Sequence, residues 1–230
     1  ALPAVVPQAR NRFSFDNECG TNMAMESSQT STTRKPKGGR QRERRPPLPL
    51  DAQRLEELAL AYVARFATSA GRLTAYCKRK LRERGHVGAA DGLPPPDIDA
   101  LVGRFVVKGY VDDGSYARAK TGGLLRRGYG ARRVDQVLRA DAISEALRDA
   151  TAPSDAELRE AAATYARRRG LGPYARKGAA ATDPRLREKQ LAAFLRAGHA
   201  SSHARHILAA RSSDEVDDWV AEARQIQDDS

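Results

Sequence analysis

From Leu50 onward, apolar residues recur at spacings of three and four, which is the period of a helix with one buried face. Leu55, Leu58, Tyr62 and Phe66 form the first such stripe. Glycines and prolines interrupt the pattern, and no segment alternates apolar and polar residues as a half-buried strand would. The sequence therefore predicts an all-α protein.

Capping residues mark where the first helices should begin and end. A hydroxyl near Thr68-Ser69 can cap the second helix, and Gly85 is a natural stop for it. After a proline-rich break, Asp97 should cap a third helix that ends at Gly109. Together these helices form a predicted three-helix unit of about residues 52–110.

The same pattern then recurs along the chain. Helices are predicted over residues 113–127, 131–139 and 141–149, and a third group opens at 153–155, with later helices after 183–184 and after Ser201-Ser202. The second helices end alike, in LRERGH, VLRADA and FLRAGH, with Ala140 in place of the glycine in the second group. The fold class predicted is all-α, with three tandem three-helix repeats forming an elongated, curved body. The expected divisions are a disordered basic tail (1–50), three repeats (51–110, 111–152 and 153–211) and an acidic C-terminal segment (212–230).

The two ends of the chain differ from its body. Residues 1–50 are rich in Ser, Thr, Asn and Pro and cannot bury a core, so disorder is expected there. The acidic end could form a last amphipathic helix with Val216, Trp219 and Val220 on one side, or it could fray as a solubilising tail.

Positive charge dominates the body. The formal net charge is +11, and residues 51–211 hold 30 basic residues, 24 of them arginine, against 18 acidic ones. Such a body favours an anionic partner, either nucleic acid or an acidic protein surface. Genomic bias toward Arg and Ala codons is the alternative explanation.

Asp112 and Asp113 are the first candidates for chemistry. General acid–base catalysis needs two carboxylates that converge on a substrate, whereas neighbours in sequence point apart on a regular element. Both lie at a predicted helix start, where carboxylates cap free N–H groups and favour the helix dipole. We therefore predict capping rather than catalysis or metal binding, with Tyr116 packed inward.

The densest basic cluster surrounds the Gly128-Tyr129-Gly130 turn. It could grip phosphates or acidic side chains, or it could be two solvated helix ends. Gly122-Gly123, just before it, could let another helix approach closely. On charge density alone, the candidate partner-binding or DNA-binding residues are Arg126, Arg127, Arg132 and Arg133, with Lys78, Arg79 and Arg82. Arg167–Lys177 is a further cluster of the same kind.

Cysteines, histidines and hydropathy give no sign of a metal, cofactor or membrane role. Cys19 and Cys77 show no metal or disulfide spacing and are expected to be free thiols. His199, His203 and His206 could share one helix face, but no fourth ligand is evident. No window is long and apolar enough to span a membrane, and the opening ALPAVV lacks the features of a signal peptide, so a cytoplasmic location is expected.

One ordered set of motifs resembles the RecX family of RecA regulators. LRERG ends the second helix, GYVDDGSYARA follows, and LRRGYGARRVDQVLRA comes after it. The residues that match the family pattern are Gly109, Tyr110, Asp112, Asp113, Tyr116, Ala117, Gly128, Tyr129 and Gly130. The chain departs from that pattern at Gly198-His199, where Gly-Phe is usual, and in the longer loop HVGAADGLPPP.

The resemblance, which covers roughly residues 52–211, implies a monomeric all-helical modulator without catalysis or cofactor. Proteins of this kind bind the RecA–DNA filament and inhibit its recombinase, ATPase and coprotease activities, so they damp DNA repair by recombination and the SOS response. The alternative is a helical protein that binds nucleic acid directly and acts without RecA. An enzyme is disfavoured, because no base–nucleophile pair is evident.

Overall fold

The structure is a computed structural model that describes residues 48–175 and 183–229. Those residues belong to a single contact-defined unit, Pro46–Ser230. They form ten α-helices and two short 3₁₀ helices, and the only β pairing among them is an isolated bridge between Leu50 and His86. The predicted all-α class is confirmed. The predicted disorder of residues 1–50 falls almost wholly outside the described part of the chain.

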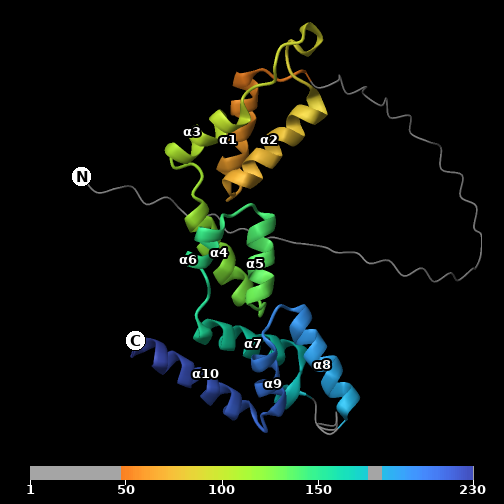
Figure 1. The fold of residues 1–230 in the computed structure, drawn as a ribbon, viewed down its shortest axis with the longest axis vertical. Coiled ribbons are helices and arrows are strands. Elements are labelled where there is room, and N and C mark those ends of the chain that lie inside the picture. Colours follow the sequence, from red (N-terminus) through yellow and green to blue (C-terminus); the bar gives the residue numbers. More distant parts are fainter. Residues whose placement is uncertain (1–47, 176–182, 230) are drawn as a thin grey trace, which may run out of the picture. The chain divides into compact units, whose positions relative to one another are not determined.

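The helices gather in three groups, each around its own apolar core (Figure 1). The first group is α1 (Ala52–Arg65), α2 (Ala70–Arg84) and α3 (Ile98–Val107), with the 3₁₀ turn η1 (Ala89–Asp91) between the last two. The second is α4 (Asp113–Leu125), α5 (Ala131–Ala140) and α6 (Glu145–Ala150). The third is α7 (Asp155–Arg169), η2 (Gly172–Tyr174), α8 (Pro184–Arg196), α9 (Ser201–Ala209) and α10 (Ser213–Asp228).

Each core is built from the residues that the helical spacing turns inward. Leu55, Leu73 and Phe105 fill the first core, together with Cys77. Leu124, Leu138 and Ile143 lie in the second, which also takes Ala161 from α7. Phe194, Ile207 and Val216 lie in the third. Burying side chains of this size stabilises the fold by about 1.5–3 kcal/mol each.

Local capping sets most of the helix starts. Ser69 and Asp97 accept hydrogen bonds from Arg72 N and Ala100 N, as their positions predict. Ser154 and Glu157 form a complete capping box at α7. Each cap satisfies main-chain N–H groups that have no partner inside the helix.

Several expectations are wrong in detail. The short helix predicted over 141–149 begins only at Glu145, because the chain turns at Asp141 and Ala142. Ala142, and not Ala140, takes the left-handed conformation of the missing glycine, with φ of 58°. Ser201 and Ser202 lie inside α9, whose N-cap is Ala200.

Two further expectations also need correction. Phe66 ends α1 as its C-cap and is 37% exposed, so it does not complete the buried stripe. Gly122 and Gly123 make no close backbone contact with another helix, because a Cβ atom added at either glycine would have only the guanidinium of Arg126 within 4 Å among the described residues.

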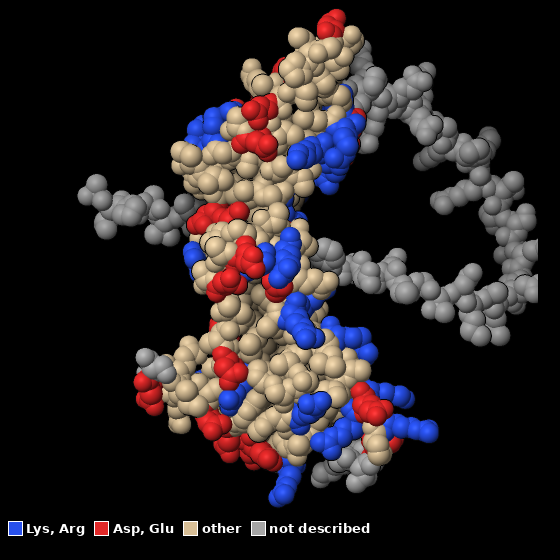
Figure 2. Space-filling model, viewed as in Figure 1, with Lys and Arg blue, Asp and Glu red and all other residues tan. Residues whose placement is uncertain are grey.

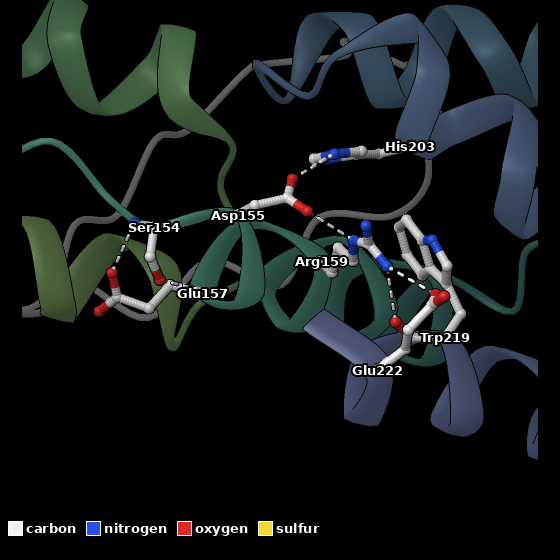
Figure 3. Close-up of polar contacts among 7 residues, drawn as sticks. All are labelled: Ser154, Asp155, Glu157, Arg159, His203, Trp219 and Glu222. Atoms are coloured by element: carbon white, nitrogen blue, oxygen red, sulfur yellow. Dashed lines mark hydrogen bonds and ion pairs between the residues drawn. The ribbon is translucent and has the colours of Figure 1, made fainter. Parts of the chain in front are cut away.

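The acidic end forms a helix rather than a frayed tail. Val216 and Val220 of α10 are buried in the third core. Figure 3 shows how Arg159 of α7 holds α10: it donates hydrogen bonds to the main-chain oxygen of Trp219 and to Glu222, and its guanidinium lies 4.8 Å from the Trp219 ring centroid. No helix within the described ranges is long and apolar enough to cross a membrane.

Candidate partner-binding site

The Gly128-Tyr129-Gly130 turn joins α4 to α5, and it also packs against the third helix group at α7 and at the end of α8. Gly128 has φ of 83°, and a Cβ atom there would lie 2.9 Å from the main-chain nitrogen of Tyr165 in α7. A Cβ atom at Gly130 would collide with the main chain of Gly198, just after α8. Both glycines are therefore required by close backbone approach.

Hydrogen bonds complete this contact between the amino end of α5 and the carboxyl end of α8. We call such an end-to-end contact between two helices a joint. Gly130 N donates to Ala197 O at 3.0 Å, and Arg132 N donates to Gly198 O at 3.1 Å. The Nε2–H of buried His199 donates to Gly128 O at 3.0 Å. The turn is thus a structural joint, and the arginines lie around it.

The four arginines of the turn have different surroundings. Arg127 Nε donates to Gly123 O at 3.1 Å, which caps the end of α4, and Arg133 donates to Gln136. Arg126 and Arg132 are exposed, and their guanidinium groups make no hydrogen bond or ion pair with any described residue. These two are the side chains that a partner could engage without breaking an internal contact.

Arg168 joins this cluster, which the sequence did not indicate. Its guanidinium donates to Arg127 O at 3.2 Å, so the end of α7 lies beside the end of α4. Two clusters separated by about 40 residues therefore form one basic region. Arg167 and Arg169 of the second cluster also lie at the end of α7, whereas Arg176 and Lys177 lie outside the described residues.

Lys78, Arg79 and Arg82 lie on α2, and no described contact connects them with the arginines of the turn. Arg79 pairs with Glu83 at 3.6 Å, while Lys78 and Arg82 are exposed and make no ion pair with a described residue. The seven predicted residues therefore occupy separate places on α2 and around the turn.

Of the two aspartates of the motif, Asp112 caps the helix that it precedes, as predicted, and Asp113 does not. Asp112 accepts from Ser115 N at 2.9 Å and from the Ser115 hydroxyl at 2.6 Å. These hydrogen bonds, the hydroxyl's first, lower the pKa of Asp112. Asp113 does not cap its own helix: it accepts from Ala70 N at 2.8 Å, at the start of α2.

Asp141 is a joint residue that the sequence analysis missed. Its buried carboxylate pairs with Arg72 at 2.8 Å and lies 3.7 Å from Lys120. The Tyr116 hydroxyl donates to the same carboxylate at 2.7 Å, which confirms that Tyr116 packs inward. Burial, followed by this hydrogen bond, raises the pKa of Tyr116. Its basic partners, Arg72 and Lys120, are the only signal for such a role, and both lie far from Asp141 in the sequence.

The joint at α2 resembles the joint at α5. The Ser69 hydroxyl donates to Asp141 O at 2.6 Å, and Gly130 N donates to Ala197 O at 3.0 Å. In both cases the N-cap residue of one helix binds the carbonyl of the C-cap residue at the end of a later helix. The carboxyl end of α5 thus meets the amino end of α2, and the carboxyl end of α8 meets the amino end of α5.

The histidines do not share one helix face. His199 precedes α9 and is buried, and its burial lowers its pKa. His203 contacts Asp155 at 3.1 Å, and His206 stacks on Trp219 with ring centroids 4.4 Å apart. Within residues 48–175 and 183–229, no three His, Cys, Asp or Glu side chains are placed to hold a metal ion.

The remaining motif residues are placed as follows. Gly109 ends α3 with φ of 73°, and Ala117 is buried in the second core. Tyr129 packs against that core. Tyr110 is 51% exposed and rests edge-on against Phe105. Most of the motif therefore builds the joints and the cores.

Comparison with known proteins gives one informative relative. The chain is 30% identical over 160 residues to a protein named Regulatory protein RecX from Myxococcus xanthus (strain DK1622). The match covers 67% of this chain and 83% of the relative. No family model matches the chain.

Proposed function

The chain belongs to the RecX family, and on this basis we propose that it binds the RecA–DNA filament and inhibits the recombinase, ATPase and coprotease activities of RecA. The observation that carries the proposal is the similarity to a regulatory protein RecX over most of that relative's length. In this role the protein would act in the cytoplasm as a monomer, would regulate DNA recombination and repair, including the SOS response, and would not be an enzyme.

We further propose that α1–α9 form three tandem three-helix repeats. The two joints support this arrangement, because each links the second helix of one group to the second helix of the next through the same pair of positions. In this scheme residues 51–110, 111–152 and 153–211 are the repeats, and 212–230 adds α10.

The contacts to the filament are assigned to the basic region around the α4–α5 turn. Arg126 and Arg132 are the primary contacts, because they are exposed and have no described partner. Arg127 and Arg133 support them while also making local hydrogen bonds. Lys78, Arg79 and Arg82 form a second contact on α2. Arginine suits this role because its planar fork matches both carboxylate and phosphate oxygens.

The test of this assignment is inhibition of RecA-promoted DNA strand exchange. The variant Arg126→Ala/Arg132→Ala should inhibit at least several-fold less at a given concentration, with an unchanged helical circular dichroism signal. Lys108→Ala/Arg205→Ala is the matched control, because it removes two exposed basic side chains elsewhere and should inhibit like wild type. Equal inhibition by all three proteins would remove Arg126 and Arg132 from the contact surface.

A further inference from the structure

Positive charge is concentrated on three helices that are joined end to end. α2, α5 and α8 together carry thirteen basic residues and three acidic ones. The other seven α-helices carry twelve basic residues and fifteen acidic ones in their sequences. The net positive charge of the helices therefore lies on α2, α5 and α8, which we call the basic track.

The joints make the track continuous. Gly130 N binds the carbonyl at the end of α8, and the Ser69 hydroxyl binds the carbonyl at the end of α5. Figure 2 shows Lys and Arg side chains gathered over α2, α5 and α8 on one face, while Asp and Glu side chains gather over α10. The 38 residues of the three helices, at 1.5 Å each, correspond to about 57 Å of helix.

Many of the basic side chains on the track have no partner among the described residues and are available to bind another molecule. Seven exposed basic side chains of the track make no hydrogen bond or ion pair with a described residue: Lys78 and Arg82 on α2, Arg132 on α5, and Arg185, Arg187, Lys189 and Arg196 on α8. On α8, residues 185, 189 and 196 share one face, because their spacings of four and seven return to the same side of a helix. By contrast, the α7 arginines Arg159 and Arg167 are already paired with carboxylates of α10.

The track lacks exposed aromatic side chains on which bases could stack. Its aromatic side chains are Tyr76 and Phe194. Tyr76 stacks on Tyr62, with ring centroids 4.2 Å apart, and Phe194 is fully buried. Stacking on exposed bases is therefore not available to the track, whereas its exposed charges suit contacts to phosphates.

We propose that the basic track binds the sugar–phosphate backbone of a nucleic acid directly, without sequence preference. A row of unpaired positive charges that continues over three helices matches a polymer with evenly repeated negative charge better than it matches an isolated acidic patch on a protein. This inference rests on the proposed function, and it adds that the basic track contacts the DNA of the RecA–DNA filament. It can fail independently, since the DNA-binding measurement that tests it contains no RecA.

The experiment measures binding of the full chain to a fluorescent 30-nucleotide single strand and to a 30-base-pair duplex, by anisotropy, between 50 and 300 mM NaCl. The test variant is Lys78→Gln/Arg132→Gln/Lys189→Gln, which removes one charge from each helix of the track. The control is Lys108→Gln/Arg205→Gln/Arg211→Gln, which removes three exposed charges elsewhere. The basic residues between Arg34 and Arg45 are the same in all three proteins, so their contribution cancels.

Wild type and control should show the same steep decline of log K with log salt. In the test variant the slope should be smaller by about 2–3, because each lost phosphate contact lowers it by about 0.7–0.9. Equal slopes in test and control variants would overturn the proposal. If the test variant fails to inhibit RecA while its DNA binding matches the control, the track instead binds an acidic protein surface. If track-dependent DNA binding is found but RecA activities do not respond to the protein, the proposed function fails and this inference stands.

Discussion

The hydroxyl of Ser69 donates a 2.6 Å hydrogen bond to the main-chain carbonyl of Asp141, 72 residues later in the chain. The same hydroxyl oxygen accepts from Arg72 N and so caps α2. One buried side chain therefore both starts a helix and joins it to the end of another. Gly130 and Ala197 repeat the joint with a main-chain donor.

Replacing Ser69 tests both roles of this hydroxyl. Ser69→Ala removes an N-cap, which costs about 1 kcal/mol, and leaves a buried carbonyl unsatisfied, which costs about 1–3 kcal/mol more. Ser144→Ala is the matched control, since Ser144 only caps α6 and should cost about 1 kcal/mol. The free energy of unfolding in urea measures both. Equal losses in the two variants would mean that the Ser69–Asp141 hydrogen bond contributes nothing to stability.

Gly71 and Ala142 should be energetically coupled across the same joint. A Cβ atom added at Gly71 would overlap the Cβ of Ala142, so Gly71→Ala alone should destabilise by about 1–3 kcal/mol. Ala142→Gly removes that Cβ and relieves a left-handed conformation, and it should stabilise by about 1 kcal/mol. In a double-mutant cycle, Gly71→Ala should cost less in the Ala142→Gly background. Additive effects would show that the two positions do not touch in solution.

His199 should make stability depend on pH. Burial lowers its pKa, so the folded protein resists protonation at a pH where the unfolded chain has already bound a proton. The free energy of unfolding should therefore fall as the pH drops below the ordinary histidine value of 6.5. His199→Gln removes this titration and should flatten the decline. The same decline in both proteins between pH 7 and 5 would contradict the buried, neutral His199.

Cys77 should be inert in the folded protein. Burial raises the pKa of its thiol to about 11, so little thiolate forms near neutral pH. In a Cys19→Ser background, an aromatic disulfide reagent at pH 8 should label Cys77 only as fast as the first helix group opens. Adding urea should accelerate labelling sharply. Rapid stoichiometric labelling without denaturant would show that the first core is open.

The sequence could predict features that depend on neighbours along the chain. Ser69, Asp97 and Asp112 cap helices because a hydroxyl or carboxylate three residues before a free N–H binds it in almost any context. The helical class follows in the same way from apolar spacing. These features need no knowledge of distant residues.

The joints could not be predicted, because their partners are far apart in sequence. Asp113 accepts a hydrogen bond at the start of α2, 43 residues earlier in the chain. Asp141 contacts Arg72, Lys120 and Tyr116, which come from two helix groups. Nothing local indicates that Ala142 would accept a positive φ. The sequence also could not distinguish the four arginines of the turn. In the structure, Arg127 and Arg133 donate hydrogen bonds to acceptors within the protein. Arg126 and Arg132 have no such acceptor among the described residues.

If the chain modulates RecA on DNA, it should change the rate of RecA-dependent ATP hydrolysis on single-stranded DNA. The protein is titrated into preassembled filaments, with its binding to the same DNA measured without RecA at the same salt concentration. We expect hydrolysis to fall at protein concentrations well below that of RecA and below those needed to cover bare DNA. Unchanged hydrolysis at concentrations that saturate the DNA would contradict it.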